Sequence, residues 1–77
     1  MPKSAFSREY RRFCALLLEE RKAAHLTQTA VARRLRKPQS YVSKYEAGER
    51  RLDVVEFLHI ARAIGFDPGG LLEKLAE

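Results

Sequence analysis

The sequence predicts a small all-α domain of five helices, and three observations lead to that prediction. The chain has 77 residues, of which 45% are hydrophobic, so it can build one core and one domain over residues 1–77. Its apolar residues recur three and four positions apart, which is the spacing of a helix face that packs against a core. Apolar and polar residues do not alternate with period two over a useful length, so no β-strand is expected.

The first two helices are placed by their caps and apolar stripes. The first begins after Ser7 and ends near residues 24–25, and its stripe is Tyr10, Phe13, Cys14, Leu17 and Leu18. The second begins after Thr27, whose hydroxyl can accept a free backbone N–H, and ends near residues 36–38 because Pro38 cannot continue a helix. Gln28, Ala32 and Leu35 are expected to share one face of this helix, with Val31 beside them.

The third and fourth helices follow on either side of a charged turn. The third spans residues 39–47, buries Val42 and Tyr45, and stops at Gly48. Asp53 and Glu56 form a capping-box pair at the start of the fourth, with Leu52 and Phe57 as a hydrophobic staple. The fourth helix ends at Gly65 and is expected to bury Val54, Val55, Leu58, Ala61 and Ile64.

The fifth helix is the weakest. It opens at Asp67-Pro68, and Gly69-Gly70 weaken its first turn. Phe66, Leu71, Leu72 and Leu75 are the apolar residues of this region. They could either complete the core of one chain or lie exposed as a dimer seam.

The net charge of +5 is concentrated in the middle of the chain. Residues 21–51 hold nine basic and two acidic side chains, for a net +7, whereas residues 52–77 hold two basic and five acidic ones, for −3. This asymmetry is expected of a face that binds a polyanion, but a solvated basic surface accounts for the charge alone equally well.

Several classes of protein are excluded by what the chain lacks. Its one cysteine, Cys14, cannot form an internal disulfide, and no N-terminal stretch has the pattern of a signal peptide. The longest apolar run, residues 13–18, is too short to cross a bilayer. Cys14, His25 and His59 share no metal-ligand spacing, and so short a chain has little room for a catalytic triad. We therefore expect a cytoplasmic, non-enzymatic domain without metal, cofactor or membrane contact.

The second and third helices have the pattern of a helix-turn-helix at about residues 28–47. Ala32 is small where the two helices would cross, and apolar Val42 and Tyr45 would hold the crossing. The other face of the third helix would enter the major groove of DNA and must be polar. That face carries Gln39, Ser40, Ser43 and Lys44, side chains able to hydrogen-bond to base edges.

Residues 26–68 resemble the lambda-repressor-like, Xre/Cro-type helix-turn-helix family. The resemblance is carried by Leu26-Thr27-Gln28, by Val42-Ser43-Lys44-Tyr45-Glu46 with Gly48, and by the helix from Leu52 to Ala63; it extends from about Leu16 to Leu72. It implies a transcriptional regulator that binds specific sequences of double-stranded DNA. A homodimer on a pseudo-palindromic operator is expected, with recognition helices about 34 Å apart.

The resemblance also implies roles for single residues. Gln39, Ser40, Ser43 and Lys44 would contact bases, and Thr27, Gln28, Tyr41, Arg50 and Arg51 would contact phosphates. Arg21 and Glu46 would form a structural ion pair. The C-terminal helix of this family often dimerises, which favours the seam for Phe66, Leu71, Leu72 and Leu75.

The sequence departs from the family pattern at two positions of the turn. Arg36 stands where glycine is usual, and Pro38 replaces the Ser or Thr that usually caps the recognition helix. Two other functions remain open: an antitoxin-type module that sequesters a partner protein, and a restriction–modification controller protein. No effector domain is evident, so regulation by a small molecule is not expected.

Overall fold

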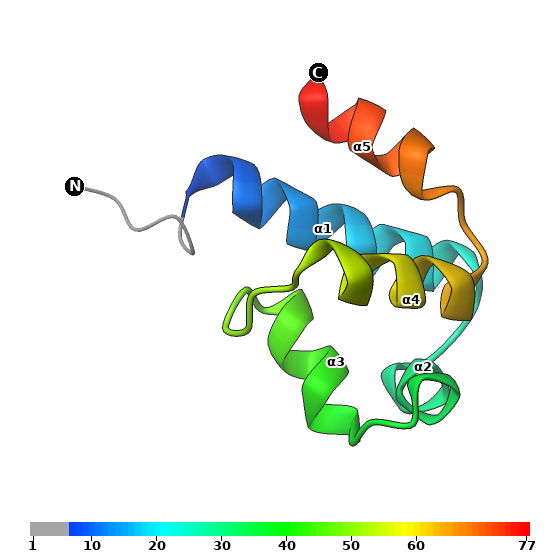
Figure 1. Cartoon of the computed structure of the whole chain (residues 1–77). Helices are drawn as coiled ribbons and strands as arrows, with labels where there is room; N and C mark the ends of the chain where they lie inside the picture. Colours follow the sequence, from blue (N-terminus) through cyan, green and yellow to red (C-terminus); the bar gives the residue numbers. More distant parts are fainter. Residues whose placement is uncertain (1–6) are drawn as a thin grey trace.

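The computed structural model describes residues 7–77 and places five α-helices in them. They are α1 (Arg8–Ala23), α2 (Gln28–Leu35), α3 (Gln39–Glu46), α4 (Val54–Ile64) and α5 (Pro68–Ala76). Helix α2 packs against α3 and α4, whereas α1 packs against α3 and α5. In Figure 1, α3 and α5 lie on opposite sides of the long helix α1. The predicted all-α, five-helix fold is confirmed.

The helix starts follow the predicted caps. Ser7 and Thr27 each accept a hydrogen bond from the backbone N–H three residues on, both at 3.0 Å. The Asp53–Glu56 capping box is complete, because each side chain accepts from the other residue's backbone N–H. Helix α3 has no side-chain cap, since Pro38 precedes it. Local sequence signals therefore set the helix boundaries to within a residue or two.

The core is formed by apolar side chains from all five helices. Leu17, Val31, Val42, Tyr45 and Ile60 have no exposed surface, and Leu71 is 1% exposed. In α1 the predicted stripe needs one correction: Leu16 is buried, whereas Leu18 is only partly buried.

The predicted inward face of α4 is largely wrong. Val54, Val55 and Leu58 are 72%, 59% and 41% exposed. The buried residues of α4 are Phe57, Ile60, Ala61 and Ile64, which follow each other at the spacing of one helical face. Because α4 is apolar on two faces, periodicity alone could not decide which one packs inward.

The turn between α2 and α3 contains Arg36, the residue that stands where glycine is usual in the family. Arg36 has a φ of +59°, in the left-handed region where a side chain carries a steric penalty that glycine avoids. His25, after α1, has the same φ. Among residues 7–77, no helix is long and apolar enough to cross a membrane, and no group of three or more potential metal-ligating side chains is found.

Candidate nucleic-acid interface

Helix α3 has one buried and one exposed face. Val42 and Tyr45 are fully buried against the core. Gln39, Ser40 and Lys44 are exposed and Ser43 is partly exposed. The structure thus brings the four residues predicted to contact bases to the outward side of one helix, which a core on its other side holds in place.

A chain of side-chain hydrogen bonds links Gln39, at the start of α3, through Gln28 to Glu46, at the end of α3. The expected Arg21–Glu46 ion pair is present: Nε of Arg21 donates to Oε2 of Glu46 at 2.7 Å and Nη2 donates to Oε1 at 3.1 Å. Nε2 of Gln28 donates to Oε1 of Glu46 at 2.9 Å. Nε2 of Gln39 in turn donates to Oε1 of Gln28 at 2.6 Å. The side chains of α1, α2 and α3 are therefore linked in one network.

The inner part of this network is well shielded from water. The side chains of Arg21 and Glu46 are 11% and 5% exposed, and their hydrogen bonds raise the pKa of the Arg21 guanidinium above its ordinary value. Arg21 also donates from Nη1 to the carbonyl oxygen of Leu26 at 3.0 Å, which ties the α1–α2 connection to the same group. Removing one partner would leave a shielded charge uncompensated, so the pair is structural.

At its outer end the network positions Gln39. One amide N–H of Gln39 is used for Gln28, while its Oε1 and second N–H have no partner among residues 7–77. An amide oxygen together with an N–H is the set that recognises N6 and N7 of adenine. The contact from Gln28 therefore orients Gln39 and still leaves it able to contact a base.

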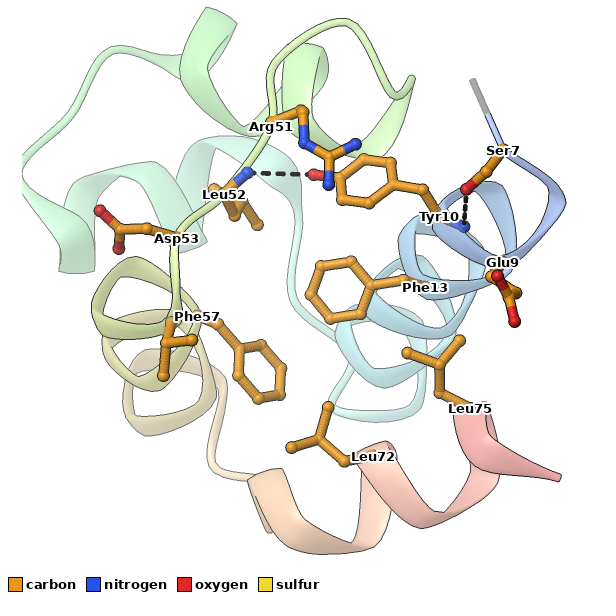
Figure 2. Close-up of a pocket in the computed structure, with 11 residues that line it drawn as sticks. Ser7, Glu9, Tyr10, Phe13, Arg51, Leu52, Asp53, Phe57, Leu72 and Leu75 are labelled. Carbon is orange, nitrogen blue, oxygen red and sulfur yellow. Dashed lines mark hydrogen bonds between the residues drawn. The ribbon is translucent and has the colours of Figure 1, made fainter. Parts of the chain in front are cut away.

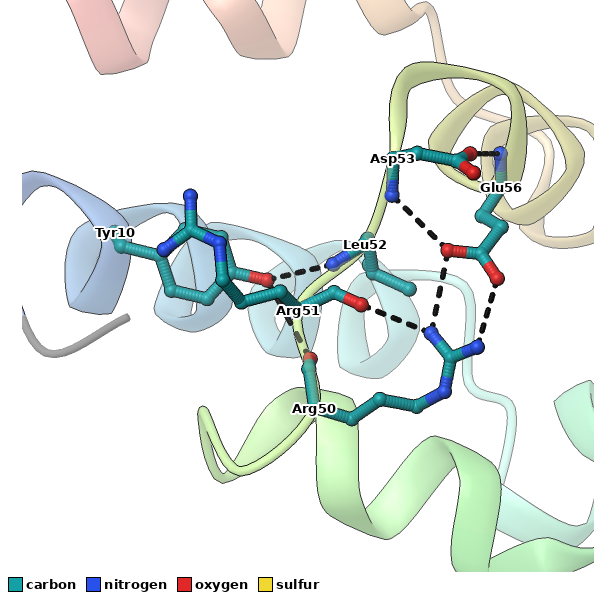
Figure 3. A network of polar contacts seen from close by, with 6 residues as sticks. All are labelled: Tyr10, Arg50, Arg51, Leu52, Asp53 and Glu56. Carbon is teal, nitrogen blue, oxygen red and sulfur yellow. Dashed lines mark hydrogen bonds and ion pairs between the residues drawn. The ribbon is translucent and has the colours of Figure 1, made fainter. Parts of the chain in front are cut away.

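The loop between α3 and α4 holds the two arginines that were predicted to contact phosphates. Figure 3 shows that the side chain of Arg50 reaches Glu56, with Nη1 and Nη2 donating to the two carboxylate oxygens at 3.2 and 2.8 Å. These bonds, followed by the backbone N–H of Asp53, hold the pKa of Glu56 below its ordinary value. The Arg50 guanidinium also lies 4.7 Å from the centre of the Tyr41 ring. Arg50 therefore has a structural role that the sequence did not reveal.

Tyr10 attaches the same loop to α1 (Figure 3). Its hydroxyl accepts from the backbone N–H of Leu52 at 3.0 Å and donates to the carbonyl oxygen of Arg50 at 3.5 Å. The Arg51 guanidinium stacks 4.2 Å from the centre of the Tyr10 ring and remains exposed. The loop is thus held from both sides, by α1 through Tyr10 and by α4 through Glu56.

The other predicted phosphate contacts lie at the surface near α3. Thr27 is exposed and caps α2, and Gln28 is partly exposed. Tyr41 is partly buried, with its ring edge-on to Tyr45 and Lys37 Nζ 5.4 Å from its centre.

The basic residues of α2, α3 and the turn between them face solvent. Arg33, Arg34, Arg36, Lys37 and Lys44 are all exposed. The ion pairs found within residues 7–77 are Arg21–Glu46 and Arg50–Glu56, so none of these five cations has an acidic partner there. The positive charge of these five side chains is therefore available to an external anion.

Away from α3, an apolar recess of about 470 Å³ opens between the start of α1, the α3–α4 loop, α4 and α5. In Figure 2 the rings of Phe13 and Phe57 and the side chains of Leu72 and Leu75 surround it. Leu72 is 47% exposed, whereas Leu71 is buried in the core of its own chain. Leu71 therefore does not fit the dimer seam that the sequence favoured, because successive residues of a helix face different directions.

Comparisons with known proteins agree with this geometry. Residues 17–71 match the helix-turn-helix family. A solved structure described as an XRE-family like protein from Pseudomonas syringae pv. tomato str. DC3000 is similar, with 54% identity, a TM-score of 0.84, and coverage of 88% of this chain and 83% of that one. No curated protein matched the chain.

A second solved structure is the restriction-modification controller protein C.AhdI from Aeromonas hydrophila. It is 32% identical with a TM-score of 0.75, and the match covers 82% of this chain and 91% of that one. The matched family is one of DNA-binding domains and not of enzymes. The protein whose α3 exposes this polar face belongs to the Xre-type, lambda-repressor-like family of helix-turn-helix DNA-binding domains.

Proposed function

We propose that this protein is a transcriptional regulator that binds specific sequences of double-stranded DNA as a homodimer on a pseudo-palindromic operator. The outward face of α3 is the observation that carries the proposal. Gln39, Ser40, Ser43 and Lys44 lie there at the surface of a helix whose other side is fully buried. A rigid helix with short polar and basic side chains on one face suits the major groove.

Gln39 and Lys44 provide the sharpest base discrimination in this proposal. Gln39 presents an oxygen and an N–H to adenine while Gln28 holds it, and Lys44 reaches the O6 and N7 acceptors of guanine. Ser40 and Ser43 adapt to either donors or acceptors because a hydroxyl group is both. Each good bidentate contact discriminates against a wrong base by about 1–3 kcal/mol.

Phosphate contacts supply the remaining affinity. Thr27 and Gln28 lie at the start of α2, where backbone N–H groups and the helix dipole favour a phosphate. Tyr41 and Arg51 add donors from α3 and the following loop. Arg50 contributes mainly by holding that loop, since its guanidinium already binds Glu56.

The second apolar face of α4 is the proposed dimer surface, which we define as Val54, Val55, Leu58 and Leu72. Val54 and Leu72 both line the 470 Å³ recess, so the exposed side chains of α4 are continuous with that of α5. Exposed apolar side chains beside an open apolar recess indicate a surface that a second chain covers.

A second copy suits this surface by charge as well. The rim of the recess carries Arg51 together with Glu9 and Asp53, so it presents both signs of charge. In a two-fold dimer each patch packs against the same patch of the other chain. A rim that carries both acidic and basic side chains can therefore pair them across the interface.

A salt titration of the DNA affinity tests the proposal. Wild-type protein should bind a duplex selected from a random library at least about 10³-fold more tightly than a scrambled duplex. The logarithm of affinity for both should fall linearly with that of salt concentration. Equal affinity for the two duplexes, or no measurable binding to either, would overturn sequence-specific regulation.

A restriction–modification controller role is the second candidate function. It is favoured by the likeness to the controller protein from Aeromonas hydrophila over most of both chains. The selected operator should then occur upstream of restriction or methyltransferase genes next to this protein's own gene. Operators found only beside unrelated genes would contradict this role and leave the more general proposal standing.

A further inference from the structure

A second recess, of about 280 Å³, lies between the end of α2, the turn that follows it and the last turns of α4. Its lining is Arg34, Leu35, Arg36, His59, Arg62 and Ala63. Three arginines and one histidine therefore line one hollow, and no acidic residue lines it. None of these residues belongs to the set predicted to contact DNA.

One of the guanidinium groups is already held in place. Nη1 of Arg34 donates to the carbonyl oxygen of Ala63 at 2.8 Å, which joins α2 to the end of α4. This bond uses one of the five N–H donors of Arg34. The side chains of Arg36, Arg62 and His59 form no hydrogen bond or ion pair with any residue in the range 7–77.

The lining of this recess is basic and includes no acidic residue. Like charges gathered around a recess repel one another, and the repulsion falls when an anion enters. Guanidinium groups match the oxygens of a phosphate in a two-pronged geometry, so arginines that line a recess favour a tetrahedral oxyanion there. Arg36 lines the recess from a left-handed backbone position that glycine would occupy without strain.

We propose that this recess binds a phosphate-type oxyanion. The oxyanion is supplied either by a free phosphorylated small molecule or by the backbone of bound DNA. The proposal goes beyond the reading of DNA by α3, because it concerns residues at the end of α2, in the following turn and in α4, and does not require any sequence specificity.

Titration with inorganic phosphate, in the absence of DNA, tests the site. At constant ionic strength with chloride as reference, phosphate should shift the NMR signals of the Arg34, Arg36 and Arg62 side chains in a saturable way. The R36Q/R62Q variant should lose at least about tenfold in phosphate affinity, because hydrogen bonds to charged groups are lost. The single R62Q variant should weaken binding in the same direction.

The matched control for R62Q is R33Q, which also removes one arginine charge, at an exposed residue of α2 outside the recess. R33Q should bind phosphate like the wild type. Absence of saturable shifts in the wild type, or equal weakening in R33Q and R62Q, would overturn the site and show only general charge screening.

A second arm identifies the source of the oxyanion. If DNA supplies it, R62Q should flatten the salt dependence of duplex binding by about one phosphate contact more than R33Q does. An unchanged salt dependence together with saturable phosphate binding assigns the site to a free ligand. A protein that failed to bind DNA would overturn the proposed function but leave the phosphate titration intact as a test of the recess.

Discussion

Lys44 and Tyr45 are neighbours in sequence with opposite surroundings. Lys44 is exposed on the outward face of α3, while Tyr45 has no exposed surface at all. The sequence predicted this division because helical spacing pairs Tyr45 with Val42 and Lys44 with Ser40. It could not predict which side chains bind each other across helices, since contacts such as Gln39–Gln28 and Arg50–Glu56 depend on how the helices pack.

Tyr45 carries a hydroxyl that is buried without a hydrogen-bond partner among residues 7–77. Burial also raises the pKa of this phenol above its ordinary value. Tyr45→Phe removes a desolvated polar group while keeping the ring, so the free energy of unfolding should stay level or rise by about 1 kcal/mol. Urea denaturation measures it, and a fall of more than about 1 kcal/mol would show that the hydroxyl has a stabilising partner.

The same pKa shift predicts behaviour at high pH. Because the folded state favours the neutral phenol, its contribution to stability is present below the unfolded pKa of about 10 and is lost as pH rises above it. Relative to the wild type, Tyr45→Phe should therefore gain stability as the pH rises above about 10, with no such gain between neutral pH and that value. Parallel stability curves for the two proteins would contradict this assignment.

The lowered pKa of Glu56 predicts a loss of stability at low pH, whereas Tyr45 predicts a loss at high pH. Its pKa is lowered mainly by the Arg50 hydrogen bonds, so its contribution to stability is present above the unfolded pKa of about 4.3 and is lost as pH falls through the folded value. Glu56→Gln should lower the thermal midpoint near pH 7 and flatten its decline toward pH 3. Thermal unfolding across this range measures both, and an acid decline as steep as that of the wild type would rule Glu56 out as its source.

At the scale of elements, caps were predictable and packing faces were not. A cap depends on residues three positions apart, as in the Asp53–Glu56 box, and such pairs are visible in a sequence. The inward face of α4 depends on which of two apolar stripes meets the other helices. Val54, Val55 and Leu58 were therefore assigned to the core although they are exposed. The same ambiguity misplaced Leu71 in the seam.

The turn between α2 and α3 offers a test of stored strain. Arg36→Gly removes the side chain from a left-handed residue, so it should raise the free energy of unfolding by about 0.5–1 kcal/mol. Denaturation by urea measures the change, with His25→Gly as a second variant at the same φ. A loss of stability in Arg36→Gly would mean that the side chain contributes more than the strain costs.

The proposed dimer surface is tested by charge. Leu58→Asp places a carboxylate within the proposed surface formed by Val54, Val55, Leu58 and Leu72, and should convert the dimer to monomer in sedimentation velocity. Thr29→Asp adds the same charge at an exposed position of α2, outside that surface, and should leave the dimer intact. An unaltered dimer in Leu58→Asp would place the interface elsewhere.

At the scale of the whole molecule, the distribution of charge was more informative than its sum. The net +7 of residues 21–51 is carried largely by exposed side chains of α2, α3 and their turn, as a polyanion-binding surface requires. Fold and family could be predicted because helix signals, apolar spacing and motif residues agreed with one another. The two recesses could not be predicted, because each is lined by residues that are far apart in the chain and come together only when the helices pack.

Selection of operators from a random duplex library, with wild-type protein and with Lys44→Ala in parallel, tests the central claim that α3 reads DNA sequence. Wild-type protein should select a two-fold symmetric site with half-site centres about 10 base pairs apart. Lys44→Ala should keep that spacing but lose preference at one position in each half-site. The same consensus from both proteins, or no consensus from the wild type, would contradict the account.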